Sequence, residues 1–202
     1  MNASAGPVGP WVTEVWAQLW VNSSDCSRLR DLLVTEKLVK PSSIIPKMHL
    51  TVYHCRRPMP GLAPLTEEAH VVVPTAETRF MVLAPGGENP RPELEPHRCK
   101  VGIRIKKTST SRVEIQEYRK RLLAHESPNV LGGRPPSTMT NSAFGARNFQ
   151  PHIALVRSGS RLERDLTKIG AVLRANIDHL ILDRFTIDIV RKDRSGNKIC
   201  DR

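Results

Sequence analysis

Two short stretches of sequence decide the fold: His49-Leu50-Thr51-Val52-Tyr53-His54, and in the second half of the chain His152-Ile153-Ala154-Leu155-Val156-Arg157. Each is an apolar run that begins with a histidine and contains β-branched residues, which favour an extended chain. Side chains alternate between the two faces of a strand, so each histidine shares a face with the residue two places later, Thr51 or Ala154. Two such strands can therefore bring two imidazoles to one site.

A pair of imidazoles at one phosphorus atom suits phosphoryl chemistry. One ring can take a proton from the attacking oxygen while the other gives a proton to the leaving oxygen, near neutral pH. The competing interpretation is structural, because the chain has seven histidines and a histidine in an apolar run is more often a core or surface residue. The matched second copy favours catalysis by His49 and His152.

The charge of the chain indicates an anionic partner. It carries 31 Lys and Arg residues against 20 Asp and Glu residues, a net charge of +11 over 202 residues. Such a field attracts polyanions, and nucleic acid or nucleotide phosphate is the natural partner. Aromatic residues make up only 4% of the chain, which argues against a broad stacking platform for single-stranded nucleic acid.

Several function classes are disfavoured. No apolar stretch approaches the ~18 residues of a membrane span, and the first residues lack a basic segment followed by an apolar core, so a cytoplasmic protein that does not enter a membrane is expected. The four cysteines (Cys26, Cys55, Cys99 and Cys200) form no CxxC pair and no zinc-ligand spacing. Cys55 follows the first motif and could suggest a nucleophile, but nothing else in the sequence supports that role. No cofactor, metal site or obligate protein partner is predicted.

The order of elements repeats. The first half predicts a strand over 11–21, a helix capped by residues 22–25 and running toward Leu38, and a histidine strand over 48–55. Short strands over 70–73 and 79–83 and a Pro-rich connector over 88–97 follow. The second half predicts a strand over 100–106 with one apolar and one basic face, a helix that uses Val113 and Leu123, an irregular stretch over 126–148 and the second histidine strand. A helix over 162–177 and a closing strand over 180–190 complete an α+β chain.

A wider segment around the second histidine carries a family resemblance. The run Phe149-Gln150-Pro151-His152-Ile153-Ala154-Leu155-Val156-Arg157 resembles the second signature of the two-histidine (2H) phosphoesterase superfamily, Phe-x-Pro-His-x-Thr-Leu-x-Arg. The similarity is to the LigT-like branch, which includes 2′-5′ RNA ligases, RNA 2′,3′-cyclic phosphodiesterases and phage enzymes that degrade cyclic oligonucleotides. The run Met48-His49-Leu50-Thr51-Val52 matches the first signature, His-x-Thr with apolar flanks.

The resemblance implies a fold and an activity. The fold would be two-lobed and pseudo-symmetric, with antiparallel strands lining a central cleft and helices outside. One domain would span 1–202, with lobes over about 10–87 and 98–193 and room for exchange of the closing strand. The activity would be that of a metal-independent phosphodiesterase, a hydrolase and nuclease acting on RNA 2′,3′-cyclic phosphate, 2′-5′ linkages or cyclic oligonucleotides. His49 and His152 would be the acid–base pair, and Thr51 and Arg157 would bind phosphate.

The sequence departs from the family at two positions. Ala154 stands where the family has Thr or Ser, so a phosphate contact is missing, or is supplied by Ser158 or by the loop at 137–142. The same departure motivates the alternative function, a non-catalytic nucleotide- or RNA-binding protein. The second departure is His54, the internal counterpart of Arg157, which joins Tyr53 among the further candidate residues.

Strand alternation makes two predictions about these candidates. The five-residue spacing should place His54 on the opposite face from His49, so that the two could not share an ion. Arg157 is also five residues from its histidine, and only a bulge or the end of the strand could aim it at the site.

Overall fold

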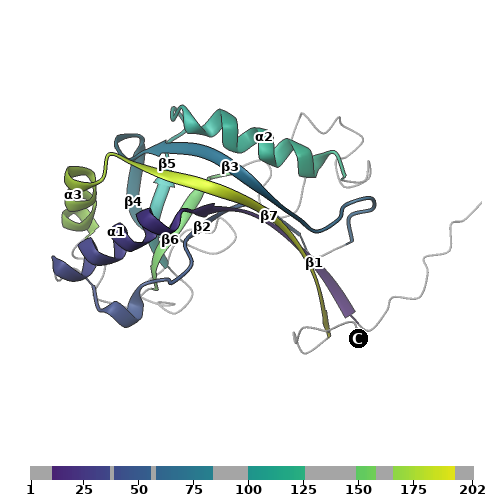
Figure 1. Ribbon diagram of the computed structural model, residues 1–202, viewed down its shortest axis with the longest axis horizontal. Coiled ribbons are helices and arrows are strands. Elements are labelled where there is room, and N and C mark those ends of the chain that lie inside the picture. The colour runs from purple at the N-terminus through teal and green to yellow at the C-terminus, as the bar shows by residue number, and fades with distance from the viewer. Residues whose placement is uncertain are drawn as a thin grey trace, which may run out of the picture.

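The computed structural model describes residues 11–36, 39–55, 58–83, 100–125, 149–157 and 166–193 (Figure 1). Among these residues lie seven strands, three α-helices and two short 3-10 helices, an α+β arrangement. In chain order they are β1 (Trp11–Val21), α1 (Ser23–Thr35), η1 (Pro41–Ser43), β2 (His49–Cys55), β3 (Leu65–Pro74), η2 (Thr75–Glu77), β4 (Thr78–Leu83), β5 (Lys100–Ile105), α2 (Ser111–Leu123), β6 (His152–Arg157), α3 (Leu166–Asn176) and β7 (His179–Asp193).

All seven strands form one open sheet in the order β3-β7-β1-β2-β6-β5-β4. Every neighbouring pair is antiparallel. The two histidine strands are neighbours at the middle of the sheet, where β2 joins β6 at the register pair Leu50 and Ile153. β1 and β7 pair along their whole length and curve together across the molecule (Figure 1).

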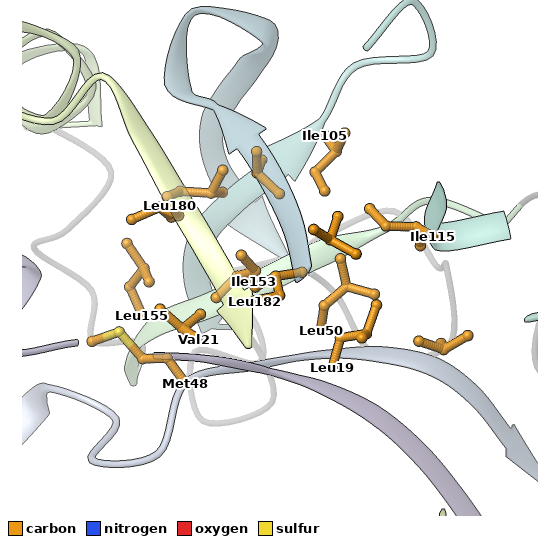
Figure 2. Close-up of a cluster of buried hydrophobic side chains, with 14 of the residues drawn as sticks. Leu19, Val21, Met48, Leu50, Ile105, Ile115, Ile153, Leu155, Leu180 and Leu182 are labelled. Carbon is orange, nitrogen blue, oxygen red and sulfur yellow. The ribbon is translucent and has the colours of Figure 1, made fainter. Parts of the chain in front are cut away.

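One face of this sheet carries the hydrophobic core. The alternate residues Val15, Ala17 and Leu19 of β1 are fully buried, and they belong to one cluster with apolar residues of the other strands and of all three helices. Figure 2 shows the centre of this cluster, where Leu50 of β2 and Ile153 of β6 lie among side chains from β1, β7 and α2. The helices therefore cover one face, and the residues between the buried ones point to the other.

Asparagine capping begins the first helix as the sequence predicts. The side chain of Asn22 accepts a hydrogen bond from the backbone N–H of Asp25 at 2.7 Å, which satisfies one of the N–H groups that the first turn leaves without an intrahelical partner. The Asp25 carboxylate then accepts a hydrogen bond from the N–H of Ile181 at 2.8 Å and ties the helix start to β7. The expected extension toward Leu38 is wrong in its end point, because α1 stops at Thr35.

Other boundaries also differ from the predictions. β3 begins at Leu65, earlier than expected, because its first six residues alternate between half-buried and exposed and so carry a weak apolar signal. Val113, predicted on the apolar side of α2, is 64% exposed. The predicted connector over 88–97, the irregular stretch over 126–148 and the residues between β6 and α3 lie outside the described residues. Within the described residues, no helix is long and apolar enough to span a membrane.

Candidate functional site

The two predicted catalytic histidines lie on the open face of adjacent strands. Leu50 and Ile153 oppose each other on the core side. Continuing that register by one residue places Thr51 opposite His152, and His49 opposite Ala154, all on the other face. His49 and His152 are then diagonal neighbours, with Cβ atoms about 7 Å apart. Their charges interact, since a protonated His152 lowers the pKa of His49.

Each imidazole is held in the same way by the backbone two residues before it. Nδ1 of His49 lies 3.3 Å from the carbonyl oxygen of Lys47, and Nδ1 of His152 lies 2.9 Å from that of Gln150. A carbonyl oxygen can only accept, so both Nδ1 atoms carry the proton. In the neutral ring Nε2 is then an unprotonated acceptor, and it is the atom available to a substrate.

An irregularity in each histidine strand turns its sixth residue back to the open face. In β2, Trp20 pairs with His49 but Trp16 pairs with His54, so one extra residue lies between the two pairs. In β6, Arg104 pairs with His152 but Lys100 pairs with Arg157, again with one extra residue. Such bulges change which side chains share a face.

The bulge in β6 agrees with the prediction for Arg157, whereas the bulge in β2 contradicts the prediction for His54. The bulge in β6 brings Arg157, five residues after His152, to the same face as that histidine, as its spacing requires. The expectation that His54 points away from His49 is wrong, because both pair with residues of one face of β1. The ring of His54 stacks on Trp16 with centroids 3.5 Å apart. Alternation alone cannot reveal an extra residue in a strand.

Another candidate, Tyr53, is not brought to this face. Tyr53 pairs with the buried Ala17 and is itself 1% exposed, so its side chain lies on the core side. Ser158, like the serines and threonines at 137–142, lies outside the described residues. Thr51 shares the open face with both histidines and with Arg157.

β5 adds cations that the sequence did not indicate as part of the site. Arg104 lies directly opposite His152, and Lys100 directly opposite Arg157. The Nε of Arg104 is buried and has no hydrogen-bond partner among the described residues. The strict alternation of β5 predicted a basic face, but the pairing of that face with a histidine strand is a tertiary contact. β2, β5 and β6 carry no carboxylate, so the charged residues of these three strands are all cations.

Burial and neighbouring positive charge both lower the pKa values of His49 and His152. Desolvation is the main reason that the pKa of His49 is below its usual value, and Lys100 and His152 add to the effect. Desolvation likewise lowers the pKa of His152, with contributions from Arg104 and Lys100. Both rings therefore favour the neutral form at neutral pH, and a bound anion would favour protonation.

The centre of the face is formed by small residues. Ala154 lies opposite Gly102 of β5 and, by the β2–β6 register, opposite His49. A Cβ on Gly102 would lie 2.1 Å from the carbonyl oxygen of Ile153 and 2.9 Å from the Cα of Ala154. Only glycine allows β5 to approach the bulge of β6 this closely. Glycine and alanine therefore lie between the two imidazoles and the three cations.

A buried arginine connects the two motifs from the core side. Arg119 of α2 is 2% exposed, and it donates a hydrogen bond to the carbonyl of Val52 at 2.6 Å, within the bulge of β2. Its guanidinium also lies 4.4 Å from the ring centroid of Phe149, which precedes the second histidine. The sequence gives no sign of this link, since Arg119 reads as one more polar helix residue.

Tryptophans of β1 flank the face on its other side. Trp20 pairs with His49, with ring centroids 4.9 Å apart. Trp16 and Trp20 alternate with buried residues of β1. This alternation could have indicated that both rings lie on the open face, although the aromatic content of the whole chain is low.

Neither cysteine among the described residues supports nucleophilic catalysis. Cys55 is fully buried on the core side, and Cys26 is half-buried. Burial raises the pKa of the Cys26 thiol and so disfavours its thiolate. Within the described ranges, no three His, Cys, Asp or Glu side chains are grouped so that they could hold a metal ion. No protein-family model matches the chain, and no curated protein is similar to it in sequence.

Proposed function

We propose that the protein is a metal-independent phosphodiesterase that acts on nucleotide phosphodiesters involving a 2′ or 3′ oxygen. One observation carries the proposal: two imidazoles on adjacent strands, each held through Nδ1 by the carbonyl two residues earlier, share an open cationic face. In this proposal both Nε2 atoms contact one phosphate group placed over Ala154. RNA 2′,3′-cyclic phosphate, 2′-5′ linkages and cyclic oligonucleotides all present such a phosphate.

The proposed mechanism divides proton transfer between the two rings. For a cyclic phosphate, one neutral imidazole removes a proton from water while the water oxygen bonds to phosphorus. The bond from phosphorus to the 2′ or 3′ oxygen breaks, and the other ring, as imidazolium, protonates that oxygen. The product is a phosphomonoester, and the two histidines have exchanged protonation states. Lys100, Arg104 and Arg157 would stabilise the charge on the equatorial oxygens, as Thr51 would by a hydrogen bond.

The fold proposal follows from the same strands. We take the chain to be a 2H phosphoesterase of the LigT-like branch, with β2 and β6 as the matched strands of two pseudo-symmetric lobes. Supporting this, β2 and β6 share the burial order half-buried, buried, half-buried, buried, buried. Each has its bulge after the second position that faces the site. A nucleotide or RNA is the corresponding partner.

The alternative is a nucleotide- or RNA-binding protein without catalysis, favoured by Ala154. A hydroxyl aimed at developing charge is absent there, and loss of such a donor can cost ~10²-fold in rate. The cations that would bind the phosphate remain in place.

The test is hydrolysis in excess EDTA of RNA with a 2′,3′-cyclic end, 2′-5′ oligoadenylate and a panel of cyclic oligonucleotides. We expect turnover of at least one substrate, and a loss on the order of 10²-fold or more for His49→Ala and for His152→Ala. The double variant should lose about as much as either single variant, because the two rings act together. His70→Ala, an exposed histidine on β3, is the matched control and should retain activity. Binding without turnover, unaffected by either histidine substitution, would select the alternative.

A further inference from the structure

A cavity lies beside the histidine face, at the start of β2 and α1. Its volume is about 750 Å³, within the ~300–1,000 Å³ of small-molecule sites. Its lining includes Trp20, Arg30, Lys47, Glu68, Asp183 and Arg184. The histidines do not line it, so it is a neighbouring site rather than the proposed catalytic one.

Two contacts connect this cavity to His49. The ring of Trp20, which forms part of the wall, has its centroid 4.9 Å from that of His49. Lys47, another lining residue, provides the carbonyl that holds Nδ1 of His49. A ligand that fills the cavity against Trp20 therefore places its next group at the histidine face.

The cavity offers a stacking surface with a fixed orientation. The indole N–H of Trp20 donates to Oγ1 of Thr186 at 2.9 Å, which restrains the ring. The guanidinium of Arg184 lies 5.3 Å from the centroid of Trp20. Flat aromatic and guanidinium groups are the surfaces on which nucleobases stack.

The charge of the cavity differs from that of the histidine face. Glu68 and Asp183 are exposed carboxylates that line the cavity. The lining balances three cations (Arg30, Lys47 and Arg184) against three carboxylates (Glu67, Glu68 and Asp183). The carboxylates can accept hydrogen bonds from N–H groups. The charge-balanced cavity therefore suits the uncharged nucleoside, and the cations of β5 and β6 suit the phosphate.

We propose that this cavity is the nucleoside subsite of the enzyme and prefers a base that presents N–H donors. The base would stack on Trp20, and its edge would donate to Glu68 or Asp183. Guanine fits best, because its N1–H and exocyclic amine form two parallel donors for one carboxylate. The position of the phosphate in this scheme rests on the proposed function, whereas the stacking and the base preference do not.

The test is direct binding, which requires no turnover. Calorimetry would compare 3′-GMP, 3′-UMP and inorganic phosphate with the full chain at one pH and salt concentration. We expect 3′-GMP to bind roughly tenfold or more tightly than phosphate, since stacking of one base on an aromatic ring has that order of effect. We expect 3′-UMP to bind between the two.

Variants separate the contributions of stacking and of the carboxylates to the binding affinity. Trp20→Ala should reduce 3′-GMP affinity roughly tenfold by loss of stacking, while Trp16→Ala, the same residue type on the same face but outside the cavity, should leave it unchanged. The combined variant Glu68→Gln and Asp183→Asn should reduce the preference for 3′-GMP over 3′-UMP. Equal binding of 3′-GMP and phosphate by the unaltered protein would overturn the subsite, as would a guanine preference that survives the carboxylate variants. Hydrolysis without base preference would leave the proposed function standing, and base-dependent binding without hydrolysis of any diester would remove that function but keep the subsite.

Discussion

Replacing Arg119 by methionine tests how the two histidine motifs are held together. The side chain lies below the sheet, bonded to the carbonyl of Val52 in one motif and against the ring of Phe149 at the start of the other. Methionine fills a similar length of core without a charge or a donor. The carbonyl of Val52 would lose this donor at the bulge that directs His54.

The expected loss of stability is a difference of opposing effects. A hydrogen bond from a charged group contributes about 1.5–3 kcal/mol, and the guanidinium–aromatic contact adds about 1–2 kcal/mol. Burial lowers the pKa of Arg119 to about 10, so removal of the charge relieves a desolvation cost on the order of 3 kcal/mol. Because these effects nearly cancel, Arg119→Met should change the free energy of unfolding by less than about 2 kcal/mol.

The effect on catalysis should be larger than the effect on stability. Displacement of a catalytic group by about 1 Å can cost 10²-fold in rate, and Arg119 restrains both strands that carry histidines. Urea unfolding and kcat would be measured on the same preparations. Arg121→Met on the same helix removes an exposed ion pair with Glu67, so it should cost less than about 1 kcal/mol and leave kcat unchanged. A folded Arg119→Met protein with undiminished kcat would refute the reasoning.

Three further substitutions test the open face. Lys100→Gln removes a charge that lowers the pKa of both histidines, so the pH–rate profile should move to higher pH while kcat/KM falls; an unmoved profile would show that the rings do not sense Lys100. Gly102→Ala places a Cβ 2.1 Å from the carbonyl oxygen of Ile153 and should cost about 1–3 kcal/mol in thermal unfolding; unchanged stability would contradict the close approach. Ala154→Thr adds a hydroxyl opposite His49 and should raise kcat about tenfold if the contact contributes ~1.4 kcal/mol, whereas a fall would mean that substrate already fills the space.

Local pattern was sufficient for the elements that carry the histidines. Alternation and β-branched residues predicted β1 and both histidine strands, and Asn22 marked the start of α1. The same alternation correctly gives the face of its strand on which each of His49, Thr51 and His152 lies. Each of these residues is within three residues of the start of its strand and precedes the bulge.

What lay beyond the bulges could not be predicted. An extra residue in a strand leaves no mark in the sequence, so alternation put His54 on the wrong face, and the candidate Tyr53 lies on the core side. The contribution of Lys100 and Arg104 depends on β5 pairing with β6, a contact between segments separated along the chain. Arg119 acts through the core, where a charged residue is not expected.

The electrostatics of the open face explain why depressed histidine pKa values are compatible with acid catalysis. Without a ligand, burial lowers the pKa of His152, and Arg104 and Lys100 lower it further. A phosphate over Ala154 reverses the sign of the local field, because an anion near a histidine stabilises its protonated form. Binding of the phosphate and uptake of the catalytic proton are then coupled, so a phosphate should bind more tightly as the pH falls toward the histidine pKa values, until the phosphate itself is protonated. In the proposed mechanism, burial and these cations together keep the rings neutral until a phosphate is bound.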